Sequence, residues 1–336
     1  MPQPVIVAAA RTPIGRAFKG SLTGLRADDL AATVITELLA RVPELDPGEV
    51  DDLYLGAWDH TGEQAENLAR RVAVLTGYDT IPGATVNRAC ASSLQTTRMA
   101  ANAIRSGDGH VFLSAGVEVV SRYPDTGDRS GLAAAPNPCF ESARARTAWR
   151  SETGAKWSDP RETEELPDIY IGMGETAENV ASLRGISRED QDAFALRSQE
   201  RAASAIERGF FAREITAVTA PDGTRVDADD GPRARVTLEA LAGLRPVFRE
   251  DGTVTAGNCC SLNDGAAAVL LMSDLRAKEL GLTPMARVLS FGATGLSPEI
   301  MGLGPVEAIR SALGKAGLNV ATSICSRSTK PSPPRS

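Results

Sequence analysis

The chain has few of the residues that metal sites and disulfide frameworks require. Among its 336 residues are only two histidines, which excludes a histidine-rich metal centre. The spacing of the five cysteines matches neither a set of metal ligands nor a framework of paired disulfides. The cysteines are Cys90, Cys139, Cys259, Cys260 and Cys325. We therefore expect no bound metal and a reducing, cytoplasmic environment.

An excess of positive charge and long apolar runs are also lacking. The formal net charge of -7 argues against a nucleic-acid partner or an anionic membrane surface. No stretch approaches the roughly 20 consecutive apolar residues that a membrane-spanning helix needs. The N-terminus shows no basic segment followed by an apolar one, so we expect no secretory signal.

What is present is an alternation of short apolar runs with amphipathic segments. The runs at 5–9, 50–55, 84–86 and 111–116 predict buried strands. The segments at 30–39, 67–75 and 92–104 have the apolar spacing of helices. This order predicts an α/β fold with a mostly parallel sheet and helices on both faces.

Two further regions follow this first unit. Residues from about 121 to 250 interrupt the alternation, first with dense Gly, Pro and charge and then with a helix that Ser187 caps. The apolar side of that helix is expected to consist of Phe194, Ala195, Ala202 and Ile206. A second α/β unit then echoes the first, with a strand at 284–289 and a helix at 304–317.

Cys90 is the strongest candidate for a chemical role. The apolar residues that follow it recur at helical spacing, so Cys90 lies at or just before a helix N-terminus. Unpaired backbone N–H groups and the helix dipole favour a thiolate there, and a thiolate is a nucleophile for acyl groups. A small buried cysteine in a tight turn fits the same segment, because free cysteine is often buried. The segment alone leaves both interpretations open.

The segment VNRACASSLQ around Cys90, residues 86–95, is one of a series of motifs spread over most of the chain. The others are AARTPIG at 9–15, GMGETAENV at 172–180, LRPVF at 244–248, TVTAGN at 253–258, NDGAAA at 263–268 and MGLGP at 301–305. In this order they resemble the motifs of the thiolases, which make or cleave 3-ketoacyl-CoA.

The resemblance implies a thiolase-like α/β fold of two related α/β halves with an inserted loop domain. Residues 1–120 would form the N-terminal half that carries the nucleophile, and residues 121–250 the loop domain that binds coenzyme A. Residues 251–320 would begin the C-terminal half, which is incomplete in this sequence. Residues 321–336 would be a disordered tail that is out of frame.

The resemblance also assigns roles to individual residues. Cys90 would be the nucleophile, and its own backbone N–H would serve one oxyanion hole. Binding of coenzyme A and the acyl chain would fall to Arg233 at the adenosine end, Phe248, Ala256 and Cys260 along the pantetheine, and Met173 and Met301 in the acyl pocket. Coenzyme A is then a substrate, and no cofactor is expected.

Two positions depart from the pattern of the family. Gly172 stands where the short-chain biosynthetic thiolases carry a histidine, which favours the degradative 3-ketoacyl-CoA thiolases. Cys260 stands where the family often has a serine that hydrogen-bonds the pantetheine. A thiol is a weak donor, so we expect weaker binding of coenzyme A.

After Val320 the sequence ATSICSRSTKPSPPRS is rich in Ser, Pro and Arg, which is typical of a disordered segment. An ordinary flexible terminus is one interpretation. A shifted reading frame is the other: with suitable codons, reading from the third base of the Val320 codon gives RDIDLFEINEAFAAQV. That sequence is a buried strand followed by the Asn-Glu-Ala-Phe motif of thiolases. We favour the frameshift, and resequencing across the Val320 codon tests it.

The sequence as printed therefore has a nucleophile without the partners that thiolases give it. The family's active-site asparagine, histidine and second cysteine belong to motifs expected after residue 320, and His60 and His110 occupy unrelated segments. The function indicated is acyl transfer between 3-ketoacyl-CoA or acetyl-CoA and coenzyme A through an acyl-cysteine, by a homodimer or homotetramer. This chain is expected to be inactive as given. The alternative is a non-catalytic thiolase-like protein that binds acyl-CoA or a partner subunit.

Cys90 is expected to be the most reactive thiol, because it alone lies at a predicted helix start. Limited alkylation followed by peptide mapping should therefore label Cys90 before Cys139, Cys259 and Cys260. Preferential labelling of any of those three would contradict the assignment.

Overall fold

The computed structural model describes residues 1–123, 136–233 and 235–321, and these divide into two compact units. Unit 1 consists of the described residues within 1–134, 195–237 and 260–288. Unit 2 consists of those within 135–194, 238–259 and 289–336. The domain boundaries expected from the sequence at 120, 250 and 320 stay predictions, and residues 322–336, which carry the proposed frameshift, lie outside the described residues.

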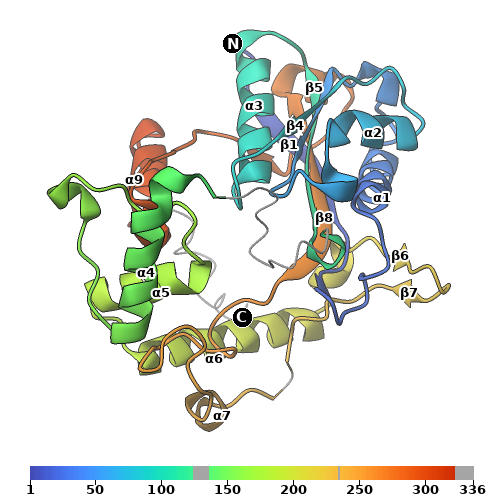
Figure 1. The fold of residues 1–336 in the computed structure, drawn as a ribbon. Coiled ribbons are helices and arrows are strands. Elements are labelled where there is room, and N and C mark those ends of the chain that lie inside the picture. The colour runs from blue at the N-terminus through green and yellow to red at the C-terminus, as the bar shows by residue number, and fades with distance from the viewer. Residues whose placement is uncertain (124–135, 234, 322–336) are drawn as a thin grey trace, which may run out of the picture. The chain divides into compact units, whose positions relative to one another are not determined.

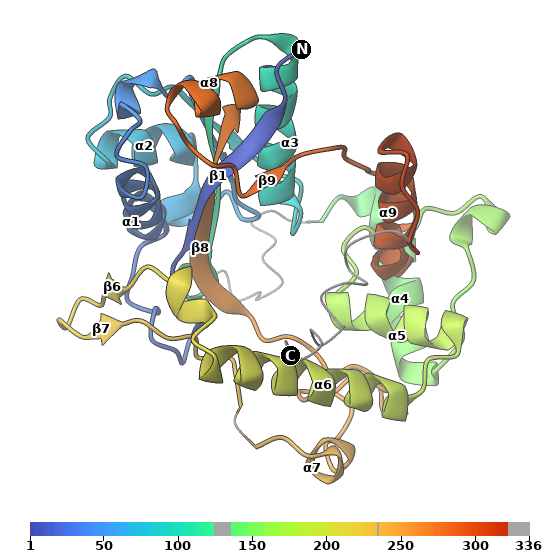
Figure 2. The same ribbon diagram turned by 180° about the vertical axis from the view of Figure 1, so that it is seen from behind.

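Unit 1 is built on a seven-stranded sheet in which six strands follow the order β4-β3-β5-β8-β1-β9 and β2 pairs with β8 (Figures 1 and 2). In chain order the strands are β1 (Pro4–Arg11), β2 (Gly15–Arg16), β3 (Asp52–Gly56), β4 (Gly83–Val86), β5 (Val111–Val119), β8 (Asn263–Ser273) and β9 (Ala286–Arg287). A separate antiparallel pair is formed by β6 (Val218–Thr219) and β7 (Arg225–Val226).

The prediction of a mostly parallel sheet is wrong. Only β3 runs parallel to its neighbours β4 and β5. Strand β8 is antiparallel to both β5 and β1, and β9 is antiparallel to β1. Strand β8 was not expected from the sequence, because its first half, NDGAAA, is made of small residues without the β-branched pattern of a strand.

Helices cover both faces of this sheet, as expected. Helices α1 (Ala27–Ala40) and α2 (Leu68–Leu75) lie on one face and α3 (Ser92–Ser106) lies on the other (Figures 1 and 2). The short α8 (Asp274–Glu279) follows β8 directly. The core lies between α1 and the sheet, where Leu30, Leu38, Leu53, Leu113 and Leu270 are each at most 1% exposed.

The strands and helices predicted for residues 5–116 are all present, and their observed ends differ from the predicted ends by a few residues. One later prediction is wrong: the strand expected at 284–289 to open a second α/β unit is only Ala286–Arg287, and it extends the β1 edge of the unit 1 sheet. The helix that Ser187 caps is confirmed as α6 (Arg188–Glu207). Two residues of its expected apolar side are largely exposed, Phe194 at 64% and Ile206 at 49%.

Unit 2 is mainly helical. Its helices are α4 (Glu141–Thr153), α5 (Met173–Arg184), α7 (Leu238–Ala242) and α9 (Gly304–Lys315), with a 3-10 turn, η7, at Pro298–Leu303. Helix α6 is shared, since residues 188–194 belong to unit 2 and the remainder to unit 1. Helix α4 was not predicted, because its sequence ESARARTAWRSET has little apolar periodicity. Helix α9 was predicted, and none of its residues is buried.

Two glycines in adjacent strands allow the first turn of α3 to approach the sheet closely. Gly56 of β3 and Gly116 of β5 are paired in register. A Cβ added at Gly56 would lie 2.6 Å from the carbonyl carbon of Ser92, and one at Gly116 would lie 2.6 Å from the Cβ of Ser93. The start of α3 therefore occupies space that only glycine leaves open.

We expect Gly56→Ala to destabilise the fold and to displace the start of α3, because the Cβ would meet backbone atoms rather than a flexible side chain. The cost of such overpacking is about 1–3 kcal/mol in the free energy of unfolding, which urea denaturation measures. Gly231→Ala is the matched control, since a Cβ there has no heavy atom within 4 Å. Equal stabilities of the two variants would contradict this packing role.

Candidate active site

Cys90 lies in a tight connection between β4 and α3, two residues before the helix begins at Ser92. Its side chain is exposed, so the structure agrees with the expected position at a helix start and not with the alternative of a buried cysteine. The preceding residue, Ala89, has a φ of 46°, an uncommon conformation for a residue with a side chain. Strain of this kind often accompanies functional turns that the surrounding structure holds in place.

Hydrogen bonds from several segments fix this turn. The Ser92 hydroxyl donates to the Ala89 carbonyl oxygen at 2.6 Å and accepts from the Arg88 amide at 2.8 Å. Asn87 accepts from the Ala89 amide at 2.8 Å and donates to the Trp58 carbonyl oxygen at 2.7 Å. The conformation around Cys90 is thus held by side chains that flank it in the sequence.

The Trp58 end of this connection is held in turn by Glu118 of β5. Its carboxylate accepts from the Trp58 amide at 2.7 Å, from Gln64 at 2.6 Å and from the Tyr123 hydroxyl at 2.7 Å. Burial, followed by the hydrogen bond to Glu118, raises the pKa of Tyr123, so the phenol stays protonated and remains a donor. Sequence reasoning missed Glu118, which is an acidic residue inside an otherwise apolar strand (VFLSAGVEV), and that interruption was the available signal.

The two histidines make local contacts. The His60 Nε2 lies 3.2 Å from the Ala57 carbonyl oxygen, and the His110 Nδ1 lies 2.9 Å from the Ser273 hydroxyl. Among the described residues, no group of histidine, cysteine, aspartate and glutamate could hold a metal ion. Cys139, Cys259 and Cys260 are exposed like Cys90, so exposure alone does not distinguish the proposed nucleophile.

Three of the residues expected to bind the acyl chain and the pantetheine come together around α5 in unit 2. Met173 is the first residue of α5, and Met301 belongs to η7, which packs against this helix. Phe248 lies against the same helix end, because a Cβ added at Gly174 would lie 2.2 Å from its ring. All three side chains remain partly exposed, at 55%, 40% and 39%.

Polar side chains of α5 hold the loop that follows Phe248. Glu178 is buried, and its carboxylate accepts from the amides of Thr253 and Val254 at 2.8 Å each. Asn179 accepts from the Arg249 guanidinium at 2.7 Å, and Glu175 accepts from it at 2.9 Å. The structure therefore gives a physical reason for the motif ETAEN, whose acidic and amide side chains fix the loop that positions Phe248.

The remaining predicted residues lie in exposed positions. Ala256 is in a turn where the Asn258 side chain accepts from the Thr255 amide at 2.8 Å. Arg233 is exposed, and its amide donates to the Gln199 side chain at 2.9 Å. Cys90, Arg233 and Cys260 belong to unit 1, whereas Met173, Phe248, Ala256 and Met301 belong to unit 2. The roles of all seven residues stay predictions.

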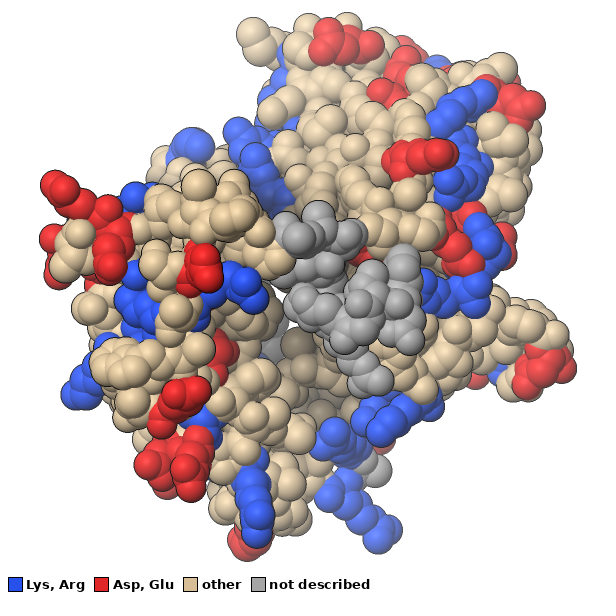
Figure 3. Space-filling view, in the orientation of Figure 1, with Lys and Arg blue, Asp and Glu red and all other residues tan. Residues whose placement is uncertain are grey.

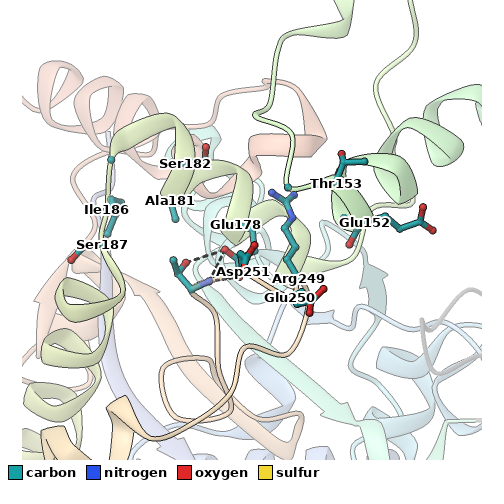
Figure 4. A pocket seen from close by; sticks show the side chains of 15 residues that line it. Glu152, Thr153, Glu178, Ala181, Ser182, Ile186, Ser187, Arg249, Glu250 and Asp251 are labelled. Carbon is teal, nitrogen blue, oxygen red and sulfur yellow. Dashed lines mark hydrogen bonds between the residues drawn. The ribbon is translucent and has the colours of Figure 1, made fainter.

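A hollow of about 360 Å³ lies beside this loop in unit 2 (Figure 4). It is lined by the C-terminal ends of α4 and α5 and by the loop 249–253, including Glu152, Ser182, Arg249 and Asp251. None of the seven residues predicted to react or to bind substrate lines it. Size alone therefore does not mark the hollow as the site of the chemistry.

The surface carries charges of both signs. On the face shown in Figure 3, Lys and Arg side chains are interspersed with those of Asp and Glu. Within the described ranges, no helix combines the length and apolar character that crossing a membrane requires.

Comparison with known proteins gives a consistent result. The model of the N-terminal domain of thiolase matches residues 4–275. A beta-ketoadipyl-CoA thiolase of Escherichia coli is 43% identical over 318 residues, which cover 92% of this chain and 76% of the relative. An acetyl-CoA acetyltransferase of Pseudomonas aeruginosa is 44% identical over 320 residues, with coverage of 93% and 77%.

Structural comparison agrees. The crystal structure of the dimeric peroxisomal thiolase of Saccharomyces cerevisiae matches with a TM-score of 0.83 and 33% sequence identity, over 95% of this chain and 77% of that one. The thiolase-like fold expected from the motifs is confirmed. Because both sequence and structure match over nearly the whole chain, this protein belongs to the thiolase family of acyltransferases.

Proposed function

We propose that this protein transfers acyl groups between a 3-ketoacyl-CoA, or acetyl-CoA, and coenzyme A, with Cys90 as the nucleophile. The observation that carries the proposal is the exposed Cys90 at the start of α3, in a turn that Ser92 and Asn87 hold in place. Its exposure leaves the sulfur accessible to an acyl-CoA, and the hydrogen bonds of the turn keep it in one place.

In the degradative direction the Cys90 sulfur attacks the 3-keto carbonyl carbon of the substrate. The bond between the α- and β-carbons breaks, its electron pair stays on the α-carbon, and protonation of that carbon releases acetyl-CoA. The thiolate of a second coenzyme A then attacks the acyl-cysteine and releases the shortened acyl-CoA together with free Cys90. The backbone N–H of Cys90 would serve one of the two oxyanion holes, and the donors of the other belong to the motifs that the family resemblance places after residue 320.

Coenzyme A is a substrate in this proposal, and no cofactor takes part. Gly172 supports the degradative direction. It is the residue before α5, and a Cβ added there would meet no heavy atom within 4 Å, so the space beside Met173 is open.

Cytoplasmic location and self-association complete the proposal. The yeast structural relative is described as dimeric, which supports a homodimer or homotetramer here. The reducing environment suits a chain whose proposed nucleophile is an exposed thiol.

No residue of this chain is assigned as the acid/base partner of Cys90 that catalysis requires. The sequence has only two histidines, and both make local contacts with Ala57 and Ser273. This observation favours a second candidate function, in which the chain binds acyl-CoA or a partner subunit without turnover.

Two measurements separate these functions. Intact-mass analysis after incubation with acetyl-CoA or a 3-ketoacyl-CoA should show acylation that Cys90→Ala abolishes and the control Cys139→Ala retains. The steady-state rate of thiolysis by the 336-residue protein should be lower than that of ordinary thiolases by about a hundredfold or more, because loss of one oxyanion donor alone has that effect on the rate. Absence of acylation together with tight acyl-CoA binding would favour the non-catalytic function, and rapid turnover would refute the expected inactivity.

A further inference from the structure

Glu299 is a charged residue at the centre of unit 2 that neither the motifs nor the proposed mechanism uses. It lies at the start of η7 and has no exposed surface. A carboxylate in such a place is costly unless it is well paired, so its partners indicate what the structure needs it for.

The carboxylate of Glu299 joins three separate segments. It accepts from the Arg150 guanidinium of α4 at 2.8 Å and from the Trp157 indole N–H at 2.7 Å. The backbone amide of Asp168, ahead of α5, donates to its other oxygen at 2.8 Å. These donors outweigh burial, which by itself would raise the pKa of Glu299, and leave that pKa lowered, so the group is ionised at neutral pH.

The main chain of Glu299 is held as well. Its carbonyl oxygen accepts from the Asn179 side chain of α5 at 2.9 Å. The next residue, Ile300, has non-helical dihedral angles, with φ at -133° and ψ at 31°, so the chain kinks just before Met301. One residue further on, a Cβ at Gly302 would lie 3.6 Å from Val180 of α5. The segment that carries Met301 is therefore held on α5 through the main chain of Glu299, while the Glu299 carboxylate holds it to α4, Trp157 and the Asp168 amide.

The surroundings of Glu299 hold more donors than acceptors. Arg146 lies 3.5 Å from the carboxylate, and buried donor atoms of Arg146, Arg150 and Ser297 have no hydrogen-bond partner within the structure. A neutral side chain at 299 would leave Arg150 buried without its counter-ion, and α4 and η7 would have to separate or readjust.

We propose that Glu299 is a positioning residue that sets the acyl-chain preference of this protein, by fixing Met301 of η7 relative to Met173 at the start of α5. This inference rests on the proposed function, because the two methionines contact an acyl chain only if the roles that the thiolase resemblance gives them hold here. The two methionine side chains remain partly exposed, while the charged cluster behind them is buried.

The first experiment observes Met301 directly and needs no acyl-CoA. Methyl-labelled methionine gives one NMR signal for each of the six methionines. Glu299→Gln should shift the Met301 signal and leave that of Met285, an exposed residue of unit 1, unchanged. Trp157→Phe removes a single hydrogen-bond donor to Glu299, so it should shift the Met301 signal in the same direction but by a smaller amount. This variant replaces Glu299→Gln in the experiment if Glu299→Gln does not fold.

The second experiment measures the affinities for acetyl-CoA, decanoyl-CoA and free coenzyme A in the same variants. The ratio of the affinities for the two acyl-CoAs should change by about tenfold, the scale on which apolar pockets discriminate chain length, whereas binding of free coenzyme A should not change. Glu307→Gln is the control, because Glu307 is an exposed carboxylate of α9 that pairs, among the described residues, with nearby Arg310, and it should alter neither readout.

The outcomes distinguish a failure of the positioning role of Glu299 from a failure of the proposed function. An unchanged Met301 signal, or an unchanged ratio of affinities in a folded variant, overturns the positioning role and leaves the proposed function standing. If the parent protein binds neither coenzyme A nor either acyl-CoA, the proposed function fails, and the assignment of Glu299 to an acyl pocket fails with it.

Discussion

Strand β8 is the element on which unit 1 depends. It lies between β5 and β1 and forms antiparallel ladders with both, so residues 263–273 join parts of the chain that are more than a hundred residues apart. Its Leu270, Leu271 and Met272 have no exposed surface. Without these two ladders, β1 would lose its place beside the parallel strands, and the core beneath α1 would be open to water.

The same sheet also provides the geometry of the proposed nucleophile. Gly56 and Gly116 let the start of α3 rest directly on the strands, and the turn that carries Cys90 follows from that contact. Ala89 accepts an unfavourable φ because Ser92 and Asn87 satisfy the surrounding backbone groups. Rigid scaffolding beneath an exposed thiol is what nucleophilic catalysis requires, since the reacting atom must keep its position while the acyl group is transferred.

Unit 2 is organised differently, through buried polar groups rather than through a sheet. Glu178 caps the backbone of Thr253 and Val254, and Glu299 holds Arg150, Trp157 and the Asp168 amide. Buried ion pairs contribute little net stability compared with apolar packing, but a buried charge that loses its partner is strongly destabilising. These carboxylates therefore define one arrangement of α4, α5 and η7 and exclude others, which suits the binding role that we propose for Phe248, Met173 and Met301.

The sequence by itself determined the family, the helices and strands of residues 5–116, and the position of Cys90 before α3. Local signals suffice there, because apolar periodicity and ordered motifs are properties of neighbouring residues. Tertiary structure alone decided that the sheet is mixed, because strand direction depends on which strands pair, and the small residues of β8 carry no local sign of it. It also decided the role of Glu299, whose partners are distant in sequence and whose burial no local pattern encodes. For Glu118 it decided the contacts with Trp58 and Gln64, which are more than 50 residues away in the sequence. A buried charge is recognised by what surrounds it, and those surroundings exist only once the chain has folded.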